Sequence, residues 1–102
     1  MQFGFSKPLP YGTDATMQRI GYQAFFDRQS NKASWVRPLG KQWHPRFHAF
    51  ISIDGEGRTI IDLHFDGKKP MHKRGTSIVE NDSPVVQAEV QRIHQIVASW
   101  FK

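Results

Sequence analysis

The sequence predicts an α+β fold: an antiparallel β-sheet built from hairpins, with one C-terminal α-helix packed on its apolar face. Residues 46–53 and 58–66 each alternate apolar and polar side chains, and a glycine-rich turn separates them. Residues 84–100 carry apolar side chains at helical spacing behind a serine and a proline. A chain of 102 residues without a repeat or a low-complexity linker is expected to form a single domain, residues 1–102.

The first expected hairpin lies in the N-terminal half, after a stretch of turn-forming residues that follows a short expected strand at residues 2–6. Residues 20–28 alternate in character, which predicts a strand. A tight turn at Ser30–Asn31 would return the chain as a partner strand at residues 33–37. This hairpin would place two pairs of side chains opposite each other, Phe26 with Trp35 and Phe25 with Val36.

The second hairpin, residues 46–53 and 58–66, is the clearest element. Its register is constrained, because a slip of one residue would move a whole apolar set to the wrong face. Pairing the apolar sets requires a three-residue loop in which Gly57 takes the left-handed conformation of a G1 bulge. On the apolar face the register pairs Ile51 with Ile61, Ala49 with Leu63 and Phe47 with Phe65. On the polar face it pairs Arg46 with Asp66, His48 with His64 and Phe50 with Asp62.

The C-terminal segment carries the strongest helix signals. Ser83 suits the N-cap and Pro84 the first helical position. One apolar stripe runs along the helix, at Val86, Val90, Ile93, Val97 and Trp100. Between the second hairpin and this helix, residues 67–75 form an expected basic loop and residues 76–80 a short expected strand.

Composition narrows the class of protein. Fourteen Lys and Arg against nine Asp and Glu give a net charge of +5 and a pI near 9.9, which favours polyanionic partners. The chain contains no cysteine, which excludes a disulfide scaffold and a thiolate zinc site. The N-terminal residues do not match a signal peptide, and no apolar run approaches the length of a membrane span. We therefore predict a cytoplasmic protein without a membrane partner.

The polar face of the second hairpin holds the candidate site. Opposed side chains in antiparallel strands have Cβ atoms about 4.5–5.5 Å apart, so His48 and His64 are expected neighbours. Together with Asp66 they are candidate ligands of a divalent metal ion. Alternatively, the two histidines are the candidate acid and base of a small RNase-like hydrolase. An ion pair between Arg46 and Asp66 would compete with metal ligation, because it gives the carboxylate another partner. Asp62 and Asp66 on the same face would also repel the phosphate of an RNA substrate.

A non-catalytic hypothesis uses the same face for binding RNA or single-stranded DNA. Phe50 would stack on bases while the basic loop holds phosphates, and Trp43 and Tyr11 on loops would add stacking surface. The residues assigned to nucleic-acid binding are Arg46, Phe50, Lys68, Lys69, Lys73 and Arg74. The sequence lacks a recognisable nucleophile motif, which favours binding over catalysis. We predict a small nucleic-acid-binding or regulatory module, with the hydrolase and a protein-interaction module pairing through a sheet edge as alternatives.

Three short segments also form a pattern along the chain: Arg46-Phe47-His48, Leu63-His64-Phe65-Asp66 and Lys68-Lys69-Pro70. This pattern resembles one in a group of small uncharacterised bacterial single-domain proteins. The resemblance implies a single domain. It implies no activity, cofactor or catalytic residue, so the functional hypotheses above depend on the residues alone.

Overall fold

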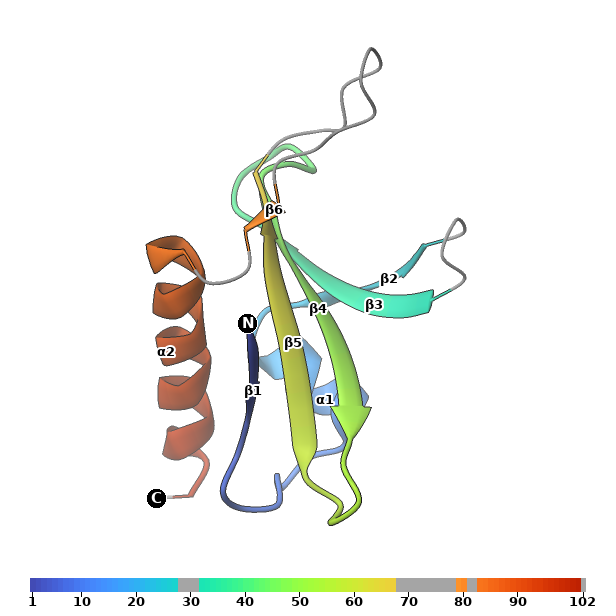
Figure 1. Cartoon of the computed structure of the whole chain (residues 1–102), viewed down its shortest axis with the longest axis vertical. Coiled ribbons are helices and arrows are strands. Elements are labelled where there is room, and N and C mark those ends of the chain that lie inside the picture. Colours follow the sequence, from blue (N-terminus) through green and yellow to red (C-terminus); the bar gives the residue numbers. More distant parts are fainter. Residues whose placement is uncertain (28–31, 68–78, 81–82, 102) are drawn as a thin grey trace.

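The sheet is built around the long hairpin of the central part of the chain. The computed structural model describes residues 1–27, 32–67, 79–80 and 83–101. Within these residues one antiparallel sheet contains β1 (Gln2–Gly4), β2 (Gln23–Asp27), β3 (Lys32–Pro38), β4 (Arg46–Ile53), β5 (Thr59–Asp66) and β6 (Val79–Glu80). The strands neighbour one another in the order β1-β5-β4-β3-β2, and β6 pairs with the C-terminal end of β5 (Figure 1).

The described part of the chain has two helices, α1 (Thr13–Arg19) and α2 (Pro84–Ser99), and both contribute to a core on one face of the sheet. In Figure 1, α2 lies along the side of the sheet formed by β1 and β5. The core side chains are Met17, Ile20, Tyr22, Trp35, Phe47, Ala49, Ile61, Leu63, Val86, Ile93 and Val97. The predicted α+β class, with a C-terminal helix against an antiparallel sheet, is confirmed. Neither described helix has the length and apolar character that a membrane span requires.

The β4–β5 hairpin has the predicted register at all six pairs. Its loop is closed by backbone hydrogen bonds from Asp54 N–H to the Arg58 carbonyl (2.9 Å) and from Gly57 N–H to the Asp54 carbonyl (3.0 Å). Gly57 adopts φ +80°, the left-handed conformation expected of the bulge residue. The Asp54 carboxylate strengthens the loop, because its Oδ1 accepts from the backbone N–H groups of Glu56 (2.9 Å) and Arg58 (2.8 Å).

Helix α1 was not predicted: it lies just before the strand expected at residues 20–28, in a stretch for which the sequence predicts no element. Its end is a Schellman motif: Gly21, at φ +99°, donates its N–H to the Gln18 carbonyl (3.1 Å), and Tyr22 donates to the Met17 carbonyl (2.9 Å). The chain becomes extended only after this motif. Strand β2 therefore begins at Gln23, three residues later than the alternation of side chains predicts.

The β2–β3 hairpin forms, but the predicted register is wrong by two residues. The observed pairs include Ala24 with Trp35 and Phe25 with Ser34. A shift of two keeps each side chain on its face, so Trp35 still enters the core, whereas Phe26 is left 55% exposed. Because Asp27 pairs with Lys32, the hairpin is centred between residues 29 and 30, one position before the centre that a turn at Ser30–Asn31 requires. The last pair joins residues 27 and 32, and the expected tight turn at Ser30–Asn31 lies outside the described residues.

Helix α2 begins at Pro84 as predicted, with Ser83 in the N-cap position. The Ser83 hydroxyl makes no capping hydrogen bond, so the start of the helix depends on backbone geometry and the proline. Three residues of the predicted apolar stripe are buried, namely Val86, Ile93 and Val97. The β6 strand, Val79–Glu80, lies within the strand expected at residues 76–80, whose first three residues are outside the described part.

A charged residue, Glu89, is buried beside this stripe and was not predicted. Its carboxylate accepts hydrogen bonds from the Tyr22 hydroxyl (2.7 Å) and from Arg92 Nε (2.7 Å) and Nη2 (2.8 Å). Arg92 Nη2 also donates to the Ile20 carbonyl at the end of α1 (2.7 Å). Burial, reinforced by the Glu89 charge, raises the pKa of Tyr22 far above its usual range. This cluster joins α2 to the end of α1.

Candidate nucleic-acid interface

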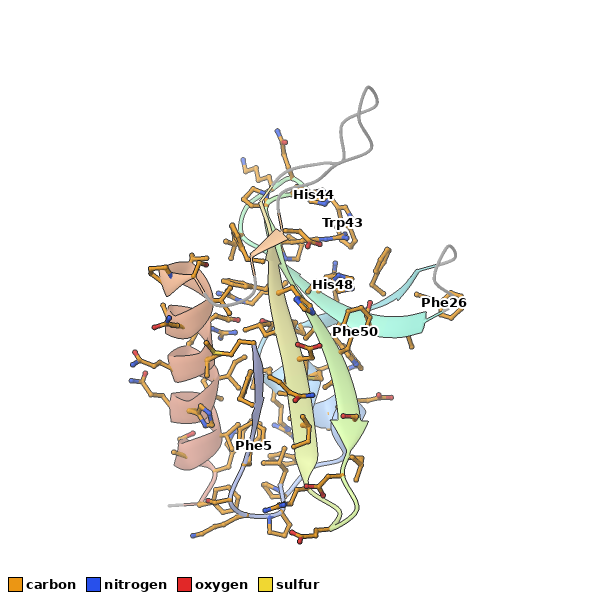
Figure 2. All side chains as sticks on the ribbon, in the orientation of Figure 1. Phe5, Phe26, Trp43, His44, His48 and Phe50 are labelled. Carbon is orange, nitrogen blue, oxygen red and sulfur yellow. The ribbon has the colours of Figure 1, made fainter. Side chains whose placement is uncertain are left out.

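The candidate residues lie on the face of the sheet opposite the core. Alternation along β4 places Arg46, His48 and Phe50 on this face, with their predicted partners on β5 opposite them. In Figure 2 the side chains of His48 and Phe50 lie in front of the β4 ribbon. A hollow of about 460 Å³ beside Phe50 is also lined by Asp62 and His64. The predicted residues of β4 and β5 therefore share one face of the sheet, and part of that face is concave.

A continuous series of rings crosses this face; we call it the ring row, and it consists of Trp43, Phe25, His48, Phe50 and His64. The centroids of Trp43 and Phe25 are 5.5 Å apart, and Phe25 is 6.2 Å from His48. His48 lies 4.8 Å from Phe50, which lies 6.1 Å from His64. These spacings fall within the range of favourable aromatic contacts. The row joins the loop before β4 to the middle of β5.

Arg46 holds one end of the ring row in place. Its Nε lies 3.2 Å from Asp66 Oδ2, which confirms the predicted ion pair. Its guanidinium carbon is 4.9 Å from the Trp43 centroid and 5.1 Å from the Phe25 centroid, a double cation–π arrangement. Arg46 is only 8% exposed. It therefore positions the two rings here, and its predicted part in nucleic-acid binding stays a prediction.

His48 is held on both ring nitrogens. Its Nε2 lies 2.8 Å from Ser34 Oγ, and its Nδ1 lies 3.6 Å from Asp66 Oδ2. The single hydroxyl proton of Ser34 is donated to the Phe25 carbonyl (3.0 Å), so the His48 Nε2–H donates to Ser34. Partial burial raises the pKa of Asp66, but hydrogen bonds and charge from His48 and Arg46 outweigh it and lower that pKa overall.

The two histidines are opposite each other, as predicted, but they turn to different carboxylates. His64 Nε2 lies 3.5 Å from Asp62 Oδ2, on its own strand, whereas His48 faces Asp66. Within the described residues no three His, Asp or Glu side chains are grouped so as to hold a metal ion. The expected ligands His48, His64 and Asp66 are thus not brought together. The reason is local: Asp62 lies two positions before His64 on the same face of the sheet, and its carboxylate is the partner of His64.

Ser34, His48 and Asp66 follow one another in the order of a hydrolase triad, but the arrangement does not suit nucleophilic attack. Ser34 is 2% exposed and lies within strand β3. Its hydroxyl is bonded to a backbone carbonyl and to His48 as acceptor. A catalytic serine must instead present its oxygen to a substrate next to donors for the oxyanion. The chain of contacts therefore fixes the ring of His48.

The predicted cationic residues of the basic loop, Lys68, Lys69, Lys73 and Arg74, lie outside the described residues. The structure places only the two ends of their segment. Asp66 pairs with Val79 across β5 and β6, so the segment leaves and re-enters the sheet at one point. That point is the Arg46 end of the β4–β5 hairpin, next to the ring row.

Two residues of the site were missed by sequence reasoning. Phe25, a member of the ring row, and Ser34, which contacts His48, lie opposite each other on β2 and β3. The predicted β2–β3 register had placed Phe25 opposite Val36. The pairing of Val36 with His48 brings this part of β3 beside the site, and no pattern within either strand predicts that pairing.

A scan of protein-family models, a search of curated proteins and a search of solved structures each found no match to this chain. The resemblance to a group of small bacterial single-domain proteins therefore stays a prediction.

Proposed function

We propose that this protein is a small module that binds single-stranded nucleic acid, RNA or DNA, with the ring row as its stacking surface. The unbroken contact of rings across one sheet face, at spacings of 4.8–6.2 Å, is the observation that carries the proposal. Every base has a π-face, so such a surface accepts bases without regard to sequence. Trp43 is 41% exposed and Phe50 is half-buried beside the hollow, so both rings offer surface to a ligand.

Charge supports the proposal at the level of the whole chain. The net charge is +5, yet the described part of the site is not strongly basic, because Arg46 is paired with Asp66 and Asp62 is 43% exposed beside His64. Attraction of phosphates is therefore assigned to the four cationic residues of the basic loop, Lys68, Lys69, Lys73 and Arg74. In this division of roles, the rings stack on bases and the loop neutralises the backbone.

Fluorescence anisotropy with labelled oligo-U and oligo-dT of about 12 nucleotides tests both roles. Phe50→Ala should weaken binding by about 5- to 150-fold, because stacking on one aromatic residue contributes about 1–3 kcal/mol per base. Ile53→Ala is the matched control, since Ile53 is an exposed apolar residue (55%) on the same strand, and alternation places it on the face opposite Phe50. Circular dichroism melts establish that each variant is folded.

The role of the basic loop is tested by salt dependence between about 50 and about 200 mM salt. The double variant Lys68→Ala with Lys69→Ala should reduce the slope of log affinity against log salt by about 1.4, at roughly 0.7 per single-strand phosphate contact. Phe50→Ala should leave that slope unchanged. The double variant Lys7→Ala with Arg19→Ala removes the same charge elsewhere and should also leave it unchanged.

Three outcomes would refute the proposal: no binding at low salt, binding that ignores salt, or equal affinity of wild type and Phe50→Ala. Cleavage of the RNA probe that His64→Ala abolishes would favour the hydrolase alternative instead, and an effect of EDTA on cleavage would indicate a metal ion.

The lack of cysteine is what supports a cytoplasmic location for this module.

A further inference from the structure

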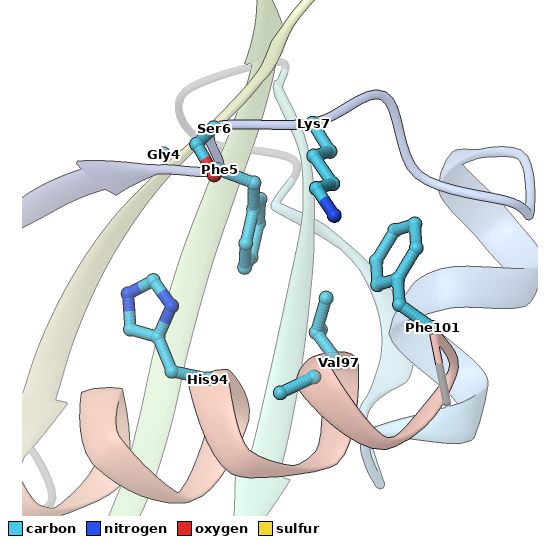
Figure 3. A pocket seen from close by; sticks show the side chains of 8 residues that line it. Gly4, Phe5, Ser6, Lys7, His94, Val97 and Phe101 are labelled. Carbon is cyan, nitrogen blue, oxygen red and sulfur yellow. The ribbon is translucent and has the colours of Figure 1, made fainter.

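A second concave site lies between the segment that follows β1 and the C-terminal half of α2 (Figure 3). Its volume is about 540 Å³, within the range of small-molecule sites. The side chains that define it are Phe5, Lys7, His94, Val97, Ala98 and Phe101. It shares no residue with the ring row, so whatever it binds is separate from the proposed nucleic-acid interface.

One wall of this cleft is a preformed aromatic cluster. The ring of His94 lies 5.2 Å from Phe5 and 5.3 Å from Phe3, and the two phenylalanines are 6.0 Å apart. These contacts fix the ring of Phe5, which projects into the cleft in Figure 3. A rigid apolar wall lowers the entropy cost of binding a flat apolar group.

The opposite wall carries a positive charge. The Lys7 ammonium lies 5.5 Å from the centroid of Phe101, and both side chains point into the cleft in Figure 3. The residues lining the cleft are all described and include no Asp or Glu. Lys7 therefore faces the cleft with a ring as its neighbour and without a carboxylate among the lining residues. An anion attached to an apolar body would complement this combination.

We propose that this cleft binds a small organic carboxylate with an aromatic body. The carboxylate pairs with the Lys7 ammonium, and the aromatic body lies between Phe5 and Phe101 above Val97. Neutral aromatic compounds fit the apolar walls but form no ion pair with Lys7. Inorganic anions meet Lys7 but leave the walls unfilled. Both parts of the ligand are thus required.

The probe pair is 2-naphthoate and its neutral analogue 2-naphthalenemethanol, titrated into the ¹⁵N-labelled full chain and followed by amide chemical shifts. Shift changes should concentrate at the residues of the cleft, and 2-naphthoate should bind about fivefold more tightly than the alcohol. Lys7→Met keeps an apolar stem and removes the charge, so it should abolish this preference. Lys41→Met changes an exposed lysine elsewhere and should retain it.

A second variant tests the apolar part of the cleft. Ala98 is exposed on α2, so Ala98→Leu adds volume to the floor while preserving helix propensity, and it should weaken both probes. Equal affinity of the two probes for the wild-type chain, or shifts centred on the ring row, would overturn the proposal. So would unchanged preference in Lys7→Met or the absence of binding at about 1 mM probe. Comparison of the two probes on the wild-type chain decides the matter even if a variant does not fold.

Discussion

Replacing Glu89 with glutamine removes a negative charge from the core with almost no change of shape. Glu89 is 4% exposed and accepts four hydrogen bonds, one from Tyr22, two from Arg92 and a longer one from Arg37 Nη1 (3.5 Å). Hydrogen bonds to charged groups contribute about 1.5–3 kcal/mol each, but the Arg92 side chain is 32% exposed and can be hydrated in the variant. Glutamine also keeps one acceptor. We therefore expect a loss of about 3 kcal/mol, the lower end for breaking a buried ion pair.

A loss of this size should lower the melting temperature by roughly 12–24 °C, at 4–8 °C per kcal/mol for a domain of this length. Urea unfolding followed by far-ultraviolet circular dichroism measures the free energy directly. Glu56→Gln is the matched control, because Glu56 is 73% exposed and forms only a surface ion pair with Arg58. Equal effects of the two substitutions, or a more stable Glu89→Gln variant, would show that the buried charge does not hold α2 to α1.

Two further predictions concern the same fold. The raised pKa of Tyr22 means that its contribution to stability is complete below the unfolded value near 10 and is lost as the pH rises above it. Wild type should therefore lose about 1 kcal/mol more than Tyr22→Phe between pH 10 and 11, measured by urea midpoints, and identical pH slopes would contradict this assignment. Gly57→Ala should destabilise the hairpin by about 1–2 kcal/mol, because Gly57 has φ +80°. A Cβ added at Gly55 would have no atom within 4 Å, and Gly55 does not have a positive φ. Gly55→Ala is therefore the control, and a loss of stability as large as that of Gly57→Ala would disprove the role of the bulge.

The sequence alone determined the β4–β5 hairpin and helix α2. In the hairpin, two apolar sets could meet only if a three-residue loop ended at a left-handed Gly57, and that loop forms. This fixed which side chains oppose one another, including the pairs of His48 and Arg46. In α2 the proline at the first helical position and the spacing of the apolar stripe are both local signals, although the Ser83 hydroxyl makes no cap. Such signals are short-range, so they can be read without knowing the rest of the fold.

Helix α1 has a local signal in the sequence, although it was not predicted. It is only seven residues long and lacks an apolar stripe, so periodicity did not reveal it. Its C-terminal motif was nevertheless present in the sequence as Gly21, whose position is typical of the residue after a helix. The alternation of Ile20 and Tyr22 around this glycine indicated a strand, because a helix end and a strand start look alike over so few residues.

The tertiary structure alone decided which polar side chains are buried and what they contact. Glu89 is buried because its donor Tyr22 arrives from a segment 67 residues away. Arg46 is enclosed because the loop bearing Trp43 and the strand bearing Phe25 fold over it. The cleft likewise needs the chain near Lys7 to meet the end of α2. These arrangements depend on burial and on contacts distant in sequence, and no periodicity along the chain encodes them.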